Sequence, residues 1–239
     1  MFSSENETLV QHYNDAFDNL LQEFRDRAAG DTLVVVHRMA ATRLGFPNLY
    51  AALNDDAPSS IKEGLKDGSS WPLRPFLTYL GPLALAVHED RKFDVMNLLR
   101  AECPLLSPAG LIGANAIAVL ETLQVSTDEL TRLIRSSDAT LRDALNFAVN
   151  AQMLQLDEAW AKYLDADAAV LSADDDPEIP SVMALLNCRA SELWGYRHYL
   201  EDLSPFATQQ GVKGAEFERV LVLIDDEEGR GQRQFSYEK

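Results

Sequence analysis

Two short runs of β-branched and aliphatic residues lie near opposite ends of the chain, at residues 32–36 and 220–224. Such runs are typical of strands that are buried on both faces, as in a parallel sheet. Residues 57–203, between them, carry helical spacing and no comparable run. We therefore expect a mainly α-helical chain with a small α/β part, in which strands 32–36 and 219–224 lie parallel in one sheet.

The same pattern predicts a discontinuous domain. Residues 1–56 and 204–239 would form one α/β layer, and residues 57–203 would form a helical domain inserted into it. Segments rich in Asp, Ser, Gly or Pro predict a boundary loop at 54–70 and an exposed linker at 165–180. The helices expected from apolar periodicity and from a capping box at Ser126 are residues 5–28, 71–87, 93–100, 108–123, 126–135, 138–151, 156–164 and 182–203.

Composition limits the classes of function. The 239 residues include 38 Asp and Glu against 21 Lys and Arg, and the resulting net charge of −17 argues against a general polyanion binder. Two isolated cysteines, Cys103 and Cys188, favour a reducing, cytoplasmic compartment. There is no signal-peptide pattern and no stretch near the ~20 apolar residues of a membrane helix, so no membrane association is expected. No metal-type pair occurs among the histidines, which are His12, His37, His88 and His198.

Two further features allow more than one interpretation. The acidic triplet at residues 174–176 is compatible with a metal site, but we favour a solvated loop because no other ligand lies nearby in the sequence. Trp194, Tyr196 and Tyr199 are compatible with a base-stacking platform, but aromatic residues at helical spacing usually face a core. We expect these three side chains to pack rather than to bind.

The most informative stretch precedes the second apolar run. Gly211 and Gly214 flank Lys213, and the loop they punctuate leads into residues 220–224 and then into an acidic turn. Glycines permit positive φ and close backbone approach, while a lysine between them supplies a cation for an anion. Because ligands of parallel sheets bind in the loops at strand ends, this loop is the candidate site.

Residues 208–217, Thr-Gln-Gln-Gly-Val-Lys-Gly-Ala-Glu-Phe, resemble motif V of superfamily-1 DNA helicases of the UvrD/Rep type. That motif reads roughly Thr-x-His-x-Ala-Lys-Gly-Leu-Glu-Phe and is followed by a hydrophobic strand. Gln210 replaces the usual histidine and Ala215 replaces the usual leucine. The matching residues are Thr208, Lys213, Gly214, Glu216 and Phe217.

A second segment is similar to the same family. The second motor domain of these helicases opens with a hydrophobic strand, then Tyr-Arg-Thr-Asn and a helix, and residues 37–40 resemble that turn, with Arg38 kept and Ala40 in place of the asparagine. A helical domain is inserted into that motor domain just before motif V. The resemblance therefore implies a partial RecA-like parallel sheet interrupted by an all-helical insertion.

The resemblance also implies roles for single residues. Thr208 and Gln210 would touch the phosphate backbone of single-stranded DNA, and Arg38 would contact the DNA strand. Lys213 and Gly214 would shape the loop at the ATP cleft between the motor domains. Glu216 would accept a hydrogen bond from the ribose of ATP.

The chain has no Gly-x-x-x-x-Gly-Lys-Ser/Thr segment, and we reject the Walker B-like interpretation of residues 221–228 for that reason. In the resembled family, the missing first motor domain would precede Met1, and an arginine-bearing motif would follow Lys239. The expectation is a helicase fragment that does not hydrolyse ATP alone, with ATP and Mg bound only by the full-length parent. The alternative is a non-catalytic, acidic helical module that binds proteins.

Overall fold

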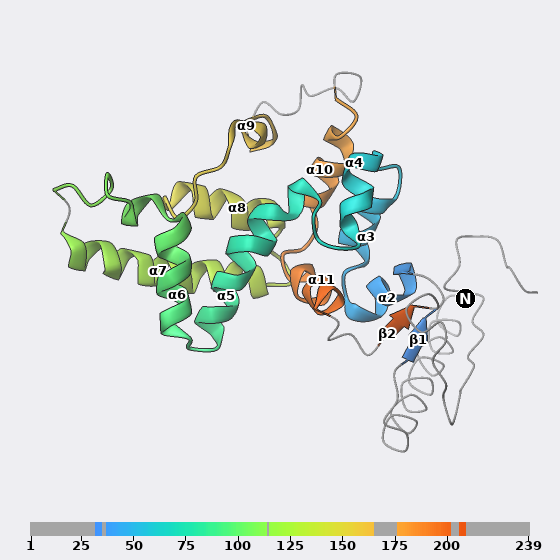
Figure 1. Ribbon diagram of the computed structural model, residues 1–239, viewed down its shortest axis with the longest axis horizontal. Coiled ribbons are helices and arrows are strands. Elements are labelled where there is room, and N and C mark those ends of the chain that lie inside the picture. The colour runs from blue at the N-terminus through green and yellow to red at the C-terminus, as the bar shows by residue number, and fades with distance from the viewer. Residues whose placement is uncertain (1–31, 35–36, 114, 165–175, 202–205, 209–239) are drawn as a thin grey trace, which may run out of the picture. The chain divides into compact units, whose positions relative to one another are not determined.

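A computed structural model describes residues 32–34, 37–113, 115–164, 176–201 and 206–208 (Figure 1). The chain divides into two compact units. One combines Met1–Met39 with Pro205–Lys239, and the other is Ala40–Ser204. The described residues are mainly helical, as the sequence predicted.

Two short strands belong to the discontinuous unit. Strand β1 (Thr32–Val34) pairs in parallel with β2 (Phe206–Thr208), with Thr32 opposite Phe206 and Val34 opposite Thr208. Strand β1 lies within the predicted run at 32–36. The predicted strand at 219–224 lies outside the described residues, as does the helix predicted at 5–28.

Helices make up the second unit. Short 3₁₀ turns lie at Glu63–Leu65, Trp71–Leu73 and Pro104–Leu106, and a π-helical turn at Phe76–Leu80 leads directly into α5. The first α-helix begins within the discontinuous unit and continues into the helical unit. The α-helices are α2 (His37–Leu44), α3 (Pro47–Asn54), α4 (Ser59–Lys62), α5 (Gly81–His88), α6 (Lys92–Glu102), α7 (Ala116–Arg135), α8 (Leu141–Asn150), α9 (Glu158–Leu164), α10 (Ile179–Leu186) and α11 (Glu192–Leu200).

The core of this unit forms around α5, which packs against α6 and α7, while α7 packs against α8 (Figure 1). Leu80, Leu83 and Ala84 are fully buried. Helix α3 packs against α10 and α11. Two buried tyrosines connect distant segments, because the Tyr79 hydroxyl donates to the Met153 carbonyl at 2.9 Å and the Tyr196 hydroxyl donates to the Leu65 carbonyl at 2.6 Å.

The domain boundary differs from the one expected at residue 56. The structure divides the chain between Met39 and Ala40, so that α3 belongs to the helical unit. The reason is burial, since Phe46, Leu49 and Leu53 are fully buried in the helical core. The expected loop at 54–70 also contains helix α4, whose Ile61 is buried in the same core.

The single helix predicted at 182–203 is wrong. Helix α10 ends at Leu186 and α11 begins at Glu192. The intervening turn bonds to the chain at the start of α8, because the Leu141 amide donates to the Cys188 carbonyl at 2.9 Å and the Ala190 amide donates to the Ala139 carbonyl at 2.8 Å. These tertiary hydrogen bonds compete with continuation of the helix.

The capping box predicted at Ser126 is also wrong, because Ser126 lies inside the single helix α7. The hydroxyl of Thr131 donates to the Thr127 carbonyl at 2.7 Å, so polar residues fit the helix interior by bonding to its own carbonyls. Helix α7 is capped at Asn115, whose side chain accepts from the Ile117 amide at 3.1 Å. The helices predicted at 93–100, 138–151 and 156–164 are confirmed as α6, α8 and α9.

Candidate functional site

The first candidate site is the edge at which β1 and β2 end. Because the strands are parallel and Val34 is paired with Thr208, the chain leaves both strands at the same edge. Helix α2 begins at His37, shortly after β1, and the glycine-containing segment 209–217 follows β2 in the sequence. This is the edge at which ligands of parallel α/β sheets bind.

Two of the predicted site residues belong to this edge. Arg38 is the second residue of α2, and Thr208 is the last residue of β2. Gln210, Lys213, Gly214 and Glu216 lie outside the described residues.

The start of α2 favours negative charge. The first turn of this helix contains no acidic residue, and its backbone amides carry the positive end of the helix dipole. Arg38 adds a cationic side chain in the same turn. Arg43 instead lies in the last turn, where its charge complements the negative end of the dipole. The edge is therefore chemically compatible with a phosphate group, and Arg38 rather than Arg43 is the arginine near it.

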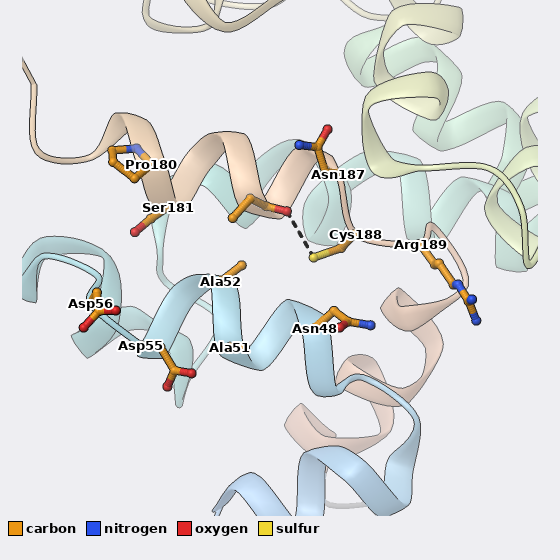
Figure 2. Close-up of a pocket in the computed structure, with 11 residues that line it drawn as sticks. Asn48, Ala51, Ala52, Asp55, Asp56, Pro180, Ser181, Asn187, Cys188 and Arg189 are labelled. Atoms are coloured by element: carbon orange, nitrogen blue, oxygen red, sulfur yellow. Dashed lines mark hydrogen bonds between the residues drawn. The ribbon is translucent and has the colours of Figure 1, made fainter. Parts of the chain in front are cut away.

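A second candidate site is a groove in the helical unit, formed between α3 and α10 with the turn that follows α10 (Figure 2). Its volume is about 660 Å³. Asp55, Asp56 and Ser181 lie at one end of the groove in this view, and Asn187 and Arg189 lie at the other. Local periodicity carries no signal for this site, because its two helices are far apart along the chain.

A buried carboxylate joins α3, which forms one side of this groove, to α11. Glu192, the first residue of α11, is only 4% exposed, and its two oxygens accept from the Asn48 side-chain nitrogen at 2.7 Å and from the Leu49 amide at 2.8 Å. The Leu49 amide is one of the first-turn donors that have no partner within α3, and the residue before this helix supplies no side-chain cap. Glu192 therefore caps α3 from a distant helix.

The two cysteines are unsuited to nucleophilic chemistry. Burial raises the pKa of the Cys188 thiol to about 12, with a further contribution from the nearby Glu192 carboxylate. The thiol donates to the Ala184 carbonyl at 3.3 Å (Figure 2). Burial also raises the pKa of Cys103, so both side chains remain protonated near neutral pH.

The alternatives left open by the sequence are partly resolved. Asp176 forms an ion pair with Lys162 and accepts from the Glu178 amide at 2.9 Å, which is a structural role at the start of α10. Across the described ranges, no three His, Cys, Asp or Glu side chains group in a way that could hold a metal ion. Tyr196 is fully buried and lies 5.4 Å from Phe46, ring centre to ring centre, so core packing is confirmed for this residue.

No protein-family model, curated protein or solved structure matches this chain. Among the residues that the structure describes, no helix combines the length and apolar composition needed to cross a bilayer.

Proposed function

We propose that this chain supplies part of the second motor domain of an ATP-dependent, UvrD/Rep-type DNA helicase. It would contribute part of the ATP cleft and part of the track for single-stranded DNA. The observation that carries this proposal is the motif V-like segment, which begins at Thr208, the last residue of a strand paired in parallel with β1.

The topology supports the proposal in two ways. A parallel pair requires a crossover connection, and here the crossover is the helical unit Ala40–Ser204. This agrees with a partial RecA-like sheet interrupted by a helical insertion. In addition, Arg38 and Thr208 belong to the same edge of the strand pair, which would allow both to contact one DNA strand.

In the proposed mechanism, ATP-driven closure of two motor domains moves one of them along single-stranded DNA. Thr208, Gln210 and Arg38 would bind the phosphate backbone, and a glutamine at 210 donates hydrogen bonds without the charge of a histidine. Lys213 and Glu216 would connect this DNA track to the ATP cleft. The described residues offer no group that fits Mg²⁺, so no step of this mechanism is assigned to metal ligands in this chain.

A second candidate function is the non-catalytic protein-binding module. The observation that favours it is an exposed apolar surface on the loop before α7 and on the first half of α7. Ile112 is 83% exposed, Ile117 is 69% exposed and Val125 is 70% exposed. Exposed apolar side chains that gather in one segment are typical of interaction surfaces.

The test begins with the genomic reading frame upstream of Met1. A P-loop in that frame supports the helicase proposal, and its absence overturns it in favour of the module. In the full-length protein, Glu216→Gln weakens a charge-assisted hydrogen bond, so the KM for ATP should rise about tenfold. Lys213→Ala should lower DNA-stimulated ATPase activity more than basal activity.

The matched control is Lys62→Ala, which removes an exposed lysine from α4 in the helical unit. Its ATPase kinetics, with and without single-stranded DNA, should equal those of the unaltered protein. Melting curves of all three variants establish that they fold. Folded Glu216→Gln and Lys213→Ala variants with unchanged kinetics would contradict the assigned roles.

A further inference from the structure

The first two turns of α7 are apolar but are not buried. Residues 116–120 read Ala-Ile-Ala-Val-Leu, and every residue of 116–122 is exposed except Val119, which is half-buried. The second half of the same helix differs, because Leu123, Leu130 and Ile134 are buried in the core. A surface helix normally directs polar residues to solvent, and a helical segment that is apolar around its circumference is normally covered. The first half of α7 therefore has the composition of a covered helix and the exposure of an uncovered one.

One face of this segment combines exposed apolar side chains with carboxylates. Ile117, Leu120 and Val125 are 69%, 43% and 70% exposed. Helical spacing places Glu121 and Asp128 on the same face of α7. Both carboxylates are exposed, and neither forms an ion pair with any residue that the structure describes. The face is therefore an apolar stripe with two carboxylates that are available to a partner.

The charge of this region distinguishes between possible partners. Residues 101–131 include four Asp and Glu residues but no Lys, Arg or His. A second copy of the chain would bring like charges together, which opposes association. Helices that lie on membranes carry Lys and Arg on their polar face, and the anionic surface of a membrane would repel this one. Charge complementarity instead favours a protein partner that is cationic and presents an apolar stripe.

We propose that the first half of α7 binds a basic amphipathic helix of another protein. The apolar stripe of that helix packs on Ile117, Leu120 and Val125, as amphipathic helices do on apolar surfaces. Its Lys or Arg side chains pair with Glu121 and Asp128, which lie two helical turns apart, or about 10 Å. This inference rests on the surface that favours the protein-binding module, and it names the partner of that surface. It does not depend on the helicase proposal.

The probe is a labelled peptide made of two Leu-Lys-Lys-Leu-Leu-Lys-Leu repeats, and the matched peptide carries glutamate in place of each lysine. Fluorescence anisotropy measures the binding of each peptide to the complete 239-residue chain, without nucleotide or DNA. The lysine peptide should bind at micromolar concentration, and the glutamate peptide at least about tenfold more weakly.

Three results would overturn the proposal. The first is failure of the lysine peptide to bind. The second is a dimer in sedimentation analysis that Ile117→Ser abolishes, which would assign the surface to a second copy. The third is flotation of the chain with phosphatidylserine vesicles that Ile117→Ser abolishes, which would assign the surface to a membrane. Because the assay needs neither ATP nor DNA, its outcome is separate from that of the helicase test.

Two double variants test the location of binding. Ile117→Ser/Val125→Ser removes two exposed apolar side chains and should weaken binding of the lysine peptide about tenfold or more. Glu121→Gln/Asp128→Asn should weaken it about threefold at low ionic strength, and less at high salt. All these positions are exposed, so melting curves should show that the variants fold.

The matched controls lie elsewhere in the helical unit. Glu63→Gln/Glu158→Gln neutralises two exposed glutamates that are outside α7, and Phe93→Ser removes a side chain of α6 that is 79% exposed. Neither control should change the affinity for the lysine peptide. A loss in the controls equal to that in the α7 variants would show diffuse attraction to a chain of net charge −17 and would overturn the assigned surface.

Discussion

Replacing Glu192 by alanine tests whether one buried carboxylate joins α3 to α11. The change removes two hydrogen bonds to a charged acceptor, at 2.7 and 2.8 Å. The Asn48 side chain is exposed and regains a partner from water, but the Leu49 amide is buried and does not. Bonds to charged groups contribute about 1.5–3 kcal/mol each, and an unsatisfied buried donor costs about 1–3 kcal/mol. Relief from burying the carboxylate offsets part of this. We expect a loss of about 3 kcal/mol in the free energy of unfolding.

Glu192→Gln keeps an acceptor oxygen but loses the charge at the start of α3. The expected loss is about 1 kcal/mol, from one weaker hydrogen bond and the missing interaction with the helix dipole. The assay is urea unfolding of the complete chain, followed by tryptophan fluorescence. At an m-value of about 3 kcal/mol/M, the alanine variant should unfold at about 1 M less urea.

Glu201→Ala is the matched control, because Glu201 is an exposed glutamate at the end of α11 that pairs with Arg197 on the surface. Such pairs contribute about 0–1 kcal/mol. Equal destabilisation by Glu192→Ala and Glu201→Ala would refute the reasoning. It would mean that the buried carboxylate contributes no more than a solvated one.

Two other predictions concern the same core. A Gly→Ala change normally stabilises a helix, but in Gly195→Ala the added methyl carbon would lie 2.0 Å from the Leu44 carbonyl oxygen. We therefore expect the free energy of unfolding to fall by about 1–3 kcal/mol, measured as a lower Tm. An unchanged or higher Tm would contradict this close approach. Burial raises the pKa of Tyr79 and Tyr196 above the ordinary value near 10, so the unfolded chain releases these protons first. Their contribution to stability is complete below about pH 10 and is lost as the pH rises further. Phenolate absorbance should therefore show at least two tyrosines that ionise only as the chain unfolds. Titration of all tyrosines in the folded chain would contradict this prediction.

Local patterns in the sequence were sufficient for several elements. Apolar periodicity predicted α6, α8 and α9, because each buries one face and follows a polar or turn-forming segment. The β-branched run at 32–36 predicted β1. It did not reveal the partner β2, since residues 206–208 are too short and too mixed to show a period.

The candidate sites depend on contacts between distant segments. The break between α10 and α11 arises from hydrogen bonds to residues 139 and 141, which no local pattern records. Ser181 and Asp55 line one groove only because α3 and α10 pack side by side. Local periodicity thus determined which segments are helical, because it reflects how each segment buries its own apolar face. The tertiary structure decided where the helices end and which polar groups meet, because those outcomes depend on partners that are far apart along the chain.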